Sequence, residues 1–263
     1  MSDWRTAASV FHRKVKRETP LEVKFYSPVV GVAETYPVVP ARKVIPDWWR
    51  KMPHDAANVP NIPDTHAGVV PGTVRRCPGI LQLLTTGWVL PLWTDFIVTE
   101  ANGQVTGAYV PPGAPPFTVH VEEQRPGMPV YAGEAPVLFH FEHTWAVQTP
   151  PGYSLRIDPM PYEVAAALVT VPGIMHADMF HQLNPIVRYR LQGDGRHEIP
   201  AGTPLCHLTL VRRADENITV SSHRDEARYD DLVWRGKGGV GPLGARLVSN
   251  SYRNYMRSRL KSP

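Results

Sequence analysis

Cysteine is scarce in this 263-residue chain, since only Cys77 and Cys206 are present and no Cys-x-x-Cys pair occurs. Each cysteine stands among apolar neighbours, so two buried free thiols are expected rather than a disulfide. No apolar run approaches the roughly 20 residues that a membrane-spanning helix needs. No signal-peptide core follows Met1, so a chain that is neither secreted nor membrane-bound is expected.

Signatures of nucleophilic and phosphate chemistry are also missing. The sequence has no Gly-x-Ser-x-Gly, no Walker loop and no His-Glu-x-x-His, so no catalytic residue is assigned. The run Gly236-Lys-Gly-Gly-Val-Gly241 contains a lysine. It has neither a preceding strand nor the Ser or Thr of a phosphate loop, and we interpret it as a hinge or arm.

Proline, in contrast, is abundant, with 28 residues in 263, about twice the usual share. Its spread along the chain disfavours long helices and favours turns, edge strands and extended connections. Short apolar runs separated by Pro-Gly and Pro-Ala-Gly turns are typical of antiparallel β-proteins. The pattern predicts a mainly β protein, a jelly-roll-like antiparallel sandwich or barrel with a few short helices and extended terminal arms.

Individual elements can be placed from local signals. Helical turns are expected at 45–52, after Pro46, and at 77–87, between Pro78 and Gly87. Asn102-Gly103 predicts a two-residue hairpin turn. The expected strands cover 22–26, 88–100 with a break at Pro91, 104–110, 117–122, 137–143, 154–158, 164–171, 186–191 and 205–212.

The two ends of the chain are basic and differ from its middle. Residues 1–17 carry five Lys and Arg side chains against one Asp, and the chain beyond Arg246 carries no acid. Amphipathic helices are expected at 3–17 and 245–260. The predicted organisation is an N-terminal arm (1–20), a β-sandwich body (21–215) and a C-terminal arm (216–263). Basic ends of this kind bind acidic protein surfaces or nucleic acid, or are simply solvated.

Several segments resemble an uncharacterised family found in tailed phages and bacteria. They are Pro46-Asp-Trp-Trp49, Arg76-Cys-Pro-Gly79, Thr86-Gly-Trp-Val-Leu-Pro-Leu-Trp-Thr-Asp95, Thr149-Pro-Pro-Gly-Tyr-Ser154 and Ile199-Pro-Ala-Gly-Thr-Pro204. The resemblance spans about residues 22 to 213 and implies relatedness and a β fold rather than an activity. The chain departs from the family pattern at His176, where the family more often has an acidic residue, and at Cys206-His207.

A fainter similarity links the chain to the β-clip of dUTPases and dCTP deaminases. The shared features are a Pro-Gly strand, a glycine-Asp loop and a late Gly-x-x-hydrophobic strand. The Gly-Arg-Ser-Ser phosphate loop and the tyrosine-bearing loop of those enzymes are missing here. Nucleotide binding in a β-clip is therefore the third hypothesis.

The sharpest chemical hypothesis is a metal site. His176 and Asp178 are two residues apart and would share a strand face, and His207 lies on a later strand whose opposite face (Cys206, Leu208, Leu210) is expected in the core. Two His and a carboxylate form the facial triad of non-haem Fe(II) oxygenases. Arg212 or Arg213 would then pair with the carboxylate of 2-oxoglutarate.

Two further pairs, His140 with Glu142 and His120 with Glu122, have the same alternate spacing. Cupin metal sites use His-x-His and a later Glu, which neither pair reproduces. We interpret these side chains as ordinary strand residues.

The first functional hypothesis is a non-catalytic assembly protein without a cofactor, of the adaptor, decoration or collar type in a phage virion. It would contact copies of itself or neighbouring subunits through residues 1–20 and 236–263, with nucleic acid as a weaker alternative partner. It would reside in the cytoplasm or on the virion. The alternative is the Fe(II) and 2-oxoglutarate oxygenase, with His176, Asp178 and His207 as ligands and Arg212 at the co-substrate.

Overall fold

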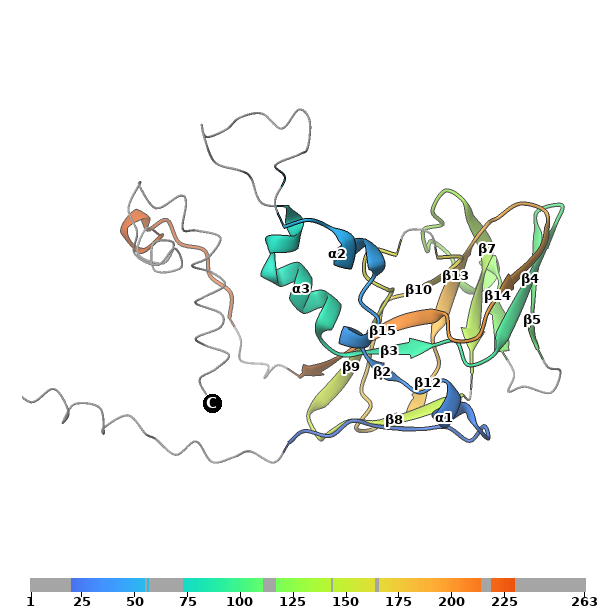
Figure 1. Cartoon of the computed structure of the whole chain (residues 1–263), viewed down its shortest axis with the longest axis horizontal. Helices are drawn as coiled ribbons and strands as arrows, with labels where there is room; N and C mark the ends of the chain where they lie inside the picture. The colour runs from blue at the N-terminus through green and yellow to red at the C-terminus, as the bar shows by residue number, and fades with distance from the viewer. Residues whose placement is uncertain are drawn as a thin grey trace, which may run out of the picture. The chain divides into compact units, whose positions relative to one another are not determined.

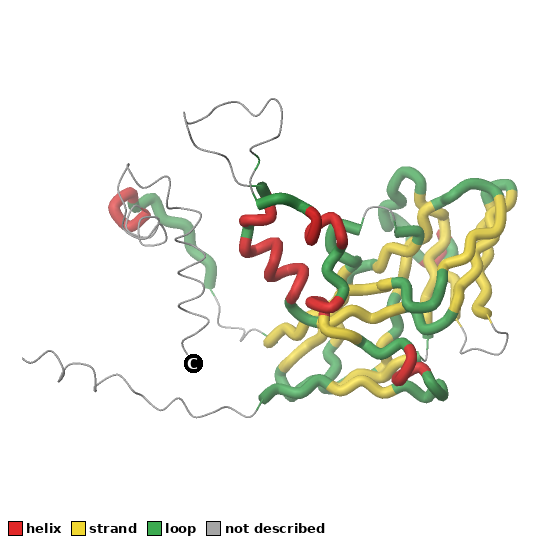
Figure 2. The backbone as a smooth tube through the Cα atoms, in the orientation of Figure 1, coloured by secondary structure: helices red, strands yellow, loops and turns green. Residues whose placement is uncertain are grey.

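Antiparallel β-strands are the main regular element of the structure, a computed structural model that describes residues 20–54, 56, 73–110, 117–142, 144–163, 166–213 and 219–229 (Figure 1). Residues Glu22–Val59 and Pro71–Ile218 form one compact unit, here called the body. Strands dominate it and the helices are short (Figure 2). The expected mainly β, antiparallel fold is confirmed. The predicted terminal helices at 3–17 and 245–260 lie outside the described residues.

The body contains short strands in four sheets, as far as the described residues go. The strands are β1 (Lys24–Tyr26), β2 (Val39–Pro40), β3 (Trp88–Pro91), β4 (Asp95–Ala101), β5 (Gln104–Val110), β6 (Phe117–His120), β7 (Glu134–Phe141), β8 (Trp145–Gln148), β9 (Tyr153–Asp158), β10 (Leu168–Thr170), β11 (Gly173–Met175), β12 (Gln182–Leu183), β13 (Ile186–Arg190), β14 (Gly195–Ile199) and β15 (Pro204–Arg212). The sheet orders are β1-β8-β12, β10-β13-β7-β6, β11-β9-β15-β3-β2 and β14-β4-β5.

Proline starts two of the short helices, α2 and α3. In the body the α-helices are α1 (Val32–Thr35), α2 (Asp47–Lys51) and α3 (Pro78–Thr85), and the 3-10 turns are Ala41–Lys43, Val74–Arg76 and Glu122–Gln124. Pro46 caps α2, and Pro78 is the first residue of α3, where its missing N–H costs nothing. Both helices were expected from these prolines. No helix in the described ranges is long and apolar enough to cross a membrane.

The hairpin β4–β5 confirms the Asn102-Gly103 turn. Its strands pair from Asp95↔Val110 to Ala101↔Gln104. Asn102 and Gly103 have φ of 51° and 77°, which are the left-handed values that a two-residue hairpin loop with matching twist requires. The break expected at Pro91 also occurs, because β3 ends there and β4 begins at Asp95.

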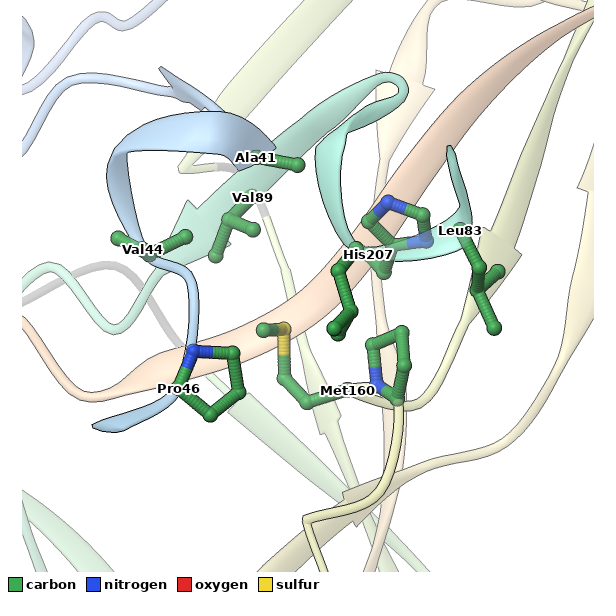
Figure 3. A pocket seen from close by; sticks show the side chains of 9 residues that line it. Ala41, Val44, Pro46, Leu83, Val89, Met160 and His207 are labelled. Carbon is green, nitrogen blue, oxygen red and sulfur yellow. The ribbon is translucent and has the colours of Figure 1, made fainter. Parts of the chain in front are cut away.

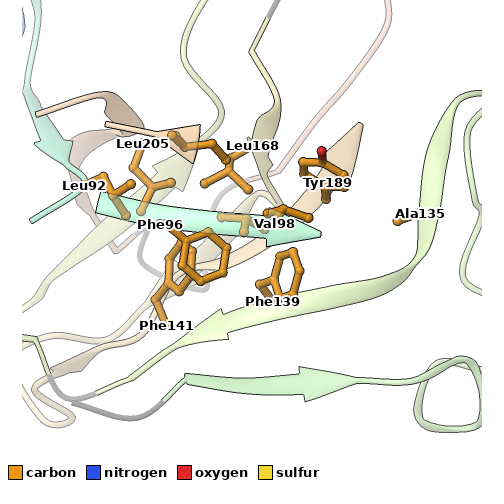
Figure 4. Close-up of a cluster of buried hydrophobic side chains, with 11 residues drawn as sticks. Leu92, Phe96, Val98, Ala135, Phe139, Phe141, Leu168, Tyr189 and Leu205 are labelled. Atoms are coloured by element: carbon orange, nitrogen blue, oxygen red, sulfur yellow. The ribbon is translucent and has the colours of Figure 1, made fainter. Parts of the chain in front are cut away.

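An aromatic cluster fills one part of the core (Figure 4). Phe96 is fully buried and its ring centre lies 5.1–5.3 Å from those of four other aromatic side chains, namely Tyr109, Phe117, Phe139 and Phe141. These are the edge-to-face distances that aromatic rings prefer. Val98, Leu168, Val187 and Tyr189 are among the other buried members of this cluster.

A second apolar cluster lies beneath β8 and β9 and includes Trp145, Val147 and Leu155. β15 contributes side chains to both clusters, since Leu205 belongs to the aromatic cluster and Cys206 and Leu208 belong to the second. The first half of β15 is therefore buried on both faces. Cys206 and Leu208 are in the core as expected, whereas Leu210 is only partly buried. The opposite face, with Leu205 and His207, is buried as well, because the aromatic cluster packs against it at Leu205.

β14 is missing from the expected strands because Gly195-Arg-His-Glu-Ile199 is mostly polar and half-exposed. It is an edge strand, defined by its pairing with β4 from Gly195↔Glu100 to Ile199↔Phe96. Single-sequence patterns detect burial, and an edge strand of this kind buries little.

Candidate functional site

His176 and Asp178 lie in a turn that follows β11. The chain reverses at 176–180, where Met179 N–H and Phe180 N–H donate to the His176 carbonyl at 3.0 and 2.9 Å. β11 itself is the outermost strand of its sheet and pairs only with β9 among the described strands. Residues 174–180, from the middle of β11 through this turn, are called the edge segment below.

Asp178 fastens the edge segment to the end of β15. Its carboxylate accepts hydrogen bonds from Arg213 Nη1 at 2.7 Å, from Arg213 Nη2 at 2.5 Å and from Gly152 N–H at 3.0 Å. Such a two-pronged Arg–carboxylate pair is geometrically specific. The hydrogen bonds from Arg213, together with that from Gly152 and against a smaller effect of burial, hold the pKa of Asp178 well below its usual range.

Two histidines add further anchors to the edge segment. His176 Nδ1 lies 2.8 Å from Ser154 Oγ on β9. His181 Nδ1 lies within 3.1 Å of the carbonyls of both Ala177 and Val147, which makes Nδ1 the protonated nitrogen. Ala177, between them, is fully buried. The segment is thus tied to β8, β9 and β15 at once.

Large apolar side chains nevertheless point outward from this anchored segment. Ile174, Met179 and Phe180 have exposed fractions of 65%, 68% and 58%. Single exposed apolar residues are ordinary, whereas several on one rigid segment are typical of contact surfaces. Because the backbone is already fixed, little conformational entropy would be lost when a partner covers them.

His207 occupies a different place on β15. It pairs with Val89 on β3 and Asp158 on β9 and is only 2% exposed. Its Nε2–H donates to the Thr86 carbonyl at 2.7 Å, whereas its Nδ1 is buried without a hydrogen-bond partner.

The predicted triad is therefore not formed. Ser154, the contact of His176, pairs with Val211, four residues along β15 from His207, which is about 13 Å at the rise of a strand. Within the described ranges no three His, Cys, Asp or Glu side chains are placed to share a metal ion. Arg213 is engaged by Asp178, and Arg212, the expected 2-oxoglutarate partner, is exposed at the end of β15.

A small apolar pocket lies over His207 (Figure 3). Its lining comes from the α2 and α3 regions, β3 and the chain after β9, and comprises Ala41, Val44, Pro46, Leu83, Leu84, Val89, Met160, Pro161 and His207. His207 is the one titratable side chain in that lining.

The Ser154–His176 pair does not resemble a nucleophile and base, because Ser154 is buried and Asp178 contacts Arg213 instead of the imidazole.

Next to this pocket, Tyr162 adopts a left-handed backbone conformation with φ of 61°. A bulky residue there is strained. Its ring meets Trp48 edge-on with centres 5.7 Å apart, and Trp48 meets Trp49 in the same way. Trp49 is buried, whereas Trp48 and Tyr162 are 39% and 50% exposed. One tryptophan of the Trp48-Trp49 pair is thus a core anchor and the other is a surface residue.

No protein-family profile matches this sequence, and neither does any curated protein. Among solved structures, the chain is similar to the dUTPase of phage phi11 of S. aureus, with 12% identity and a TM-score of 0.24 over 43% of this chain and 99% of that one. For a mutant of the same phi11 enzyme the identity is 13% and the TM-score 0.24, over 43% of this chain and 100% of that one. For a mutant dUTPase of Staphylococcus bacteriophage 80alpha the identity is 12% and the TM-score 0.23, over 42% of this chain and 99% of that one. We draw no function from likenesses of this size.

Proposed function

We propose that this protein is a non-catalytic assembly protein whose body associates with other copies of itself or with neighbouring subunits. One observation carries the proposal: the edge segment presents Ile174, Met179 and Phe180 to solvent although its backbone is tied to three strands. A rigid surface with apolar anchors is what protein–protein contacts use at their centre. The resemblance of the Thr149–Ser154 segment to proteins of tailed phages supports a virion setting.

A second copy of the chain is the occupant that we favour. β11 is the outermost strand of its sheet within the described residues, and an outermost strand is where a strand of a second chain can pair. Two copies related by a two-fold axis would bring two such edges together, and the same residues would then contribute from both sides. The apolar side chains beside β11 would be covered in the same step.

The experiment measures the oligomeric state of the full chain by sedimentation velocity and light scattering. The unsubstituted chain is expected to associate, and Met179→Asp with Phe180→Asp is expected to weaken association at least about tenfold, because two charges would be buried at the contact. The matched control is Val130→Asp, a similarly exposed apolar residue, at 49%, on a different loop. It is expected to leave association unchanged.

A chain that stays monomeric at every concentration would overturn self-association through the body. Association that survives the double substitution but is lost when residues 1–20 or 236–263 are removed would move the contact to the terminal arms. Far-ultraviolet circular dichroism of each variant would show that the body remains folded.

A further inference from the structure

Two histidines lie close together on the outer face of the β6–β7 pair, which belongs to a different sheet from β11 of the edge segment. β6 and β7 are antiparallel, with Thr118 opposite His140 and His120 opposite Leu138. Alternate residues on a strand share a face. Phe139 and Phe141 point into the aromatic cluster, so His140 and Glu142 point the other way, as do Thr118 and His120 on β6.

The geometry of this cluster is close. The imidazole centres of His120 and His140 are 5.3 Å apart, with the ring planes inclined by 32°. His140 Nδ1 lies 3.4 Å from Glu142 Oε1, and Thr118 Oγ1–H donates to the same carboxylate oxygen at 2.7 Å. His120 Nε2 is buried without a hydrogen-bond partner. An imidazole nitrogen that is buried without a hydrogen-bond partner lowers the stability of the folded protein, unless a ligand binds it.

We propose that His120 and His140 bind a divalent first-row transition-metal ion, with Zn²⁺ as the ion best suited to them. A bond of about 2.1 Å from zinc to an imidazole nitrogen places each ring centre about 3.2 Å from the ion. Two rings at a tetrahedral angle around one ion are then about 5.2 Å apart. The observed separation of 5.3 Å matches this value.

Glu142 supplies the charge that such a site needs. Imidazoles bound to zinc commonly have a carboxylate beside them, either as a further ligand or as the acceptor for the second ring nitrogen. Glu142 stands beside His140 Nδ1 in this way. Because no three-residue ligand set is preformed in the described part of the chain, water would complete the coordination. Imidazole ligands favour Zn²⁺, Cu²⁺ and Ni²⁺ over Mg²⁺ and Ca²⁺.

The positive charge of Arg188, on the neighbouring strand β13, does not prevent an ion from binding. Arg188 on β13 stands opposite Leu138, which separates it from His120 in the sheet. Its guanidinium is 3.7 Å from Glu134 and lies over the Tyr131 ring at 4.5 Å. Its charge is thus compensated within its own contacts. This inference stands apart from the assembly proposal, since the edge segment contributes no ligand.

The test is a calorimetric titration of the full chain with Zn²⁺ in a buffer that does not bind metals. Every protein carries Cys77→Ser, because Cys77, expected from the sequence to be buried, is an exposed thiol that would itself bind zinc. One equivalent of Zn²⁺ is expected to bind. His120→Ala and His140→Ala are each expected to weaken binding at least about tenfold, and Glu142→Gln by about tenfold. His223→Ala, an exposed histidine elsewhere, is the matched control and should bind as before.

Cobalt(II) in place of zinc gives a second readout, because tetrahedral coordination produces intense visible absorption that both histidine variants should lose. Zinc binding that is equal in the His120→Ala, His140→Ala double variant and the control would overturn the proposal, as would an unsubstituted chain that binds no zinc. Metal-free circular dichroism and melting curves check the fold. If His140→Ala does not fold, His120→Asn, on the outermost strand of its sheet, decides the question by the same titration.

Discussion

Arg213 holds both carboxylate oxygens of Asp178, at 2.7 Å for Oδ1 and 2.5 Å for Oδ2. The two residues are separated by 35 positions in the chain, and their pairing closes the end of β15 onto the turn after β11. Met179 and Phe180 follow Asp178 directly. Two residues that the sequence analysis assigned to an oxygenase site, one as a metal ligand and the other at the co-substrate, therefore pair with each other and position two exposed apolar side chains.

The first prediction concerns the pH dependence of this pair. The pKa of Asp178 is lowered in the folded protein, so its contribution to stability is fully present above the unfolded value of about 3.9 and is lost as pH falls through the folded pKa. Asp178→Asn is expected to lower the urea midpoint equally at pH 7 and pH 5. The difference should shrink only below about pH 4, which urea melts at pH 7, 5 and 3 would measure.

Asp47→Asn is the matched control, since Asp47 is an exposed helix carboxylate 3.6 Å from Lys51. Exposed ion pairs of this kind contribute little to stability, so the urea midpoint of Asp47→Asn should barely differ from that of the original chain at any of the three pH values. A difference between the original chain and Asp178→Asn that is already gone at pH 5 would contradict the assignment. Hydrogen exchange at 176–181 should also become faster in Asp178→Asn.

Much of the fold follows from local sequence signals. Pro78 and Gly87 frame α3, Asn102-Gly103 makes the β4–β5 turn, and the apolar run at 205–212 becomes β15. These signals succeed because each fixes backbone conformation within a few residues. β14 and the two-residue strands β2 and β12 do not have such signals, because they are defined by pairing with distant partners.

The candidate site was harder to predict, for a physical reason. The spacing of His176 and Asp178 assumes one continuous strand, but β11 ends at Met175 and the turn sends the two side chains to different partners. The distance to His207 depends on the register of β9 against β15, which no local pattern specifies. The adjacent apolar pair Met179-Phe180 in a turn was the signal available for the edge segment. His120 and His140 were recognisable singly, and only the β6–β7 register brings them together.

A second prediction concerns a buried carboxylate. Glu100, 6% exposed, accepts hydrogen bonds from Tyr189 OH and Gln192 N–H, both at 2.7 Å, and from Gly193 N–H at 3.2 Å. Burial raises the pKa of Glu100, but these hydrogen bonds and nearby His197 outweigh it and the net pKa is lowered. Tyr189→Phe should lower the free energy of unfolding by about 1.5–3 kcal/mol, the usual value for a hydrogen bond to a charged group.

The measurement is a double-mutant cycle of Tyr189→Phe with Glu100→Gln, read by urea unfolding at pH 7. Glu100→Gln alone should cost more than Tyr189→Phe, because the new amide N–H₂ would face backbone N–H donors. A coupling energy of about 0.5–3 kcal/mol is expected for residues in one network. Fully additive effects would mean that the two side chains do not interact in solution.

A third prediction tests the aromatic cluster through a glycine. A Cβ atom at Gly107 on β5 would lie 2.5 Å from Phe96 Cζ and 3.0 Å from Phe139 Cε1. Gly107→Ala should therefore destabilise the protein by about 1–3 kcal/mol through overpacking. Gly173→Ala on β11 is the control, because a Cβ there meets nothing within 4 Å. Thermal melts of both should separate them, and equal melting temperatures would contradict the packing described for Phe96.

The last prediction uses the space over His207. His207→Ala removes the hydrogen bond to the Thr86 carbonyl and leaves a cavity continuous with the apolar pocket. The expected loss is about 2–5 kcal/mol of unfolding free energy, as for other large-to-small substitutions in a core. Cavities of this kind bind small apolar or aromatic molecules that fit. Added imidazole has the shape and the donor of the missing ring, so it should raise the melting temperature of His207→Ala in a concentration-dependent manner while leaving the unsubstituted chain unchanged. An equal rise in melting temperature for the two proteins would show that imidazole acts elsewhere. If His207→Ala without imidazole melts at the same temperature as the original chain, His207 does not stabilise the junction between α3 and β15.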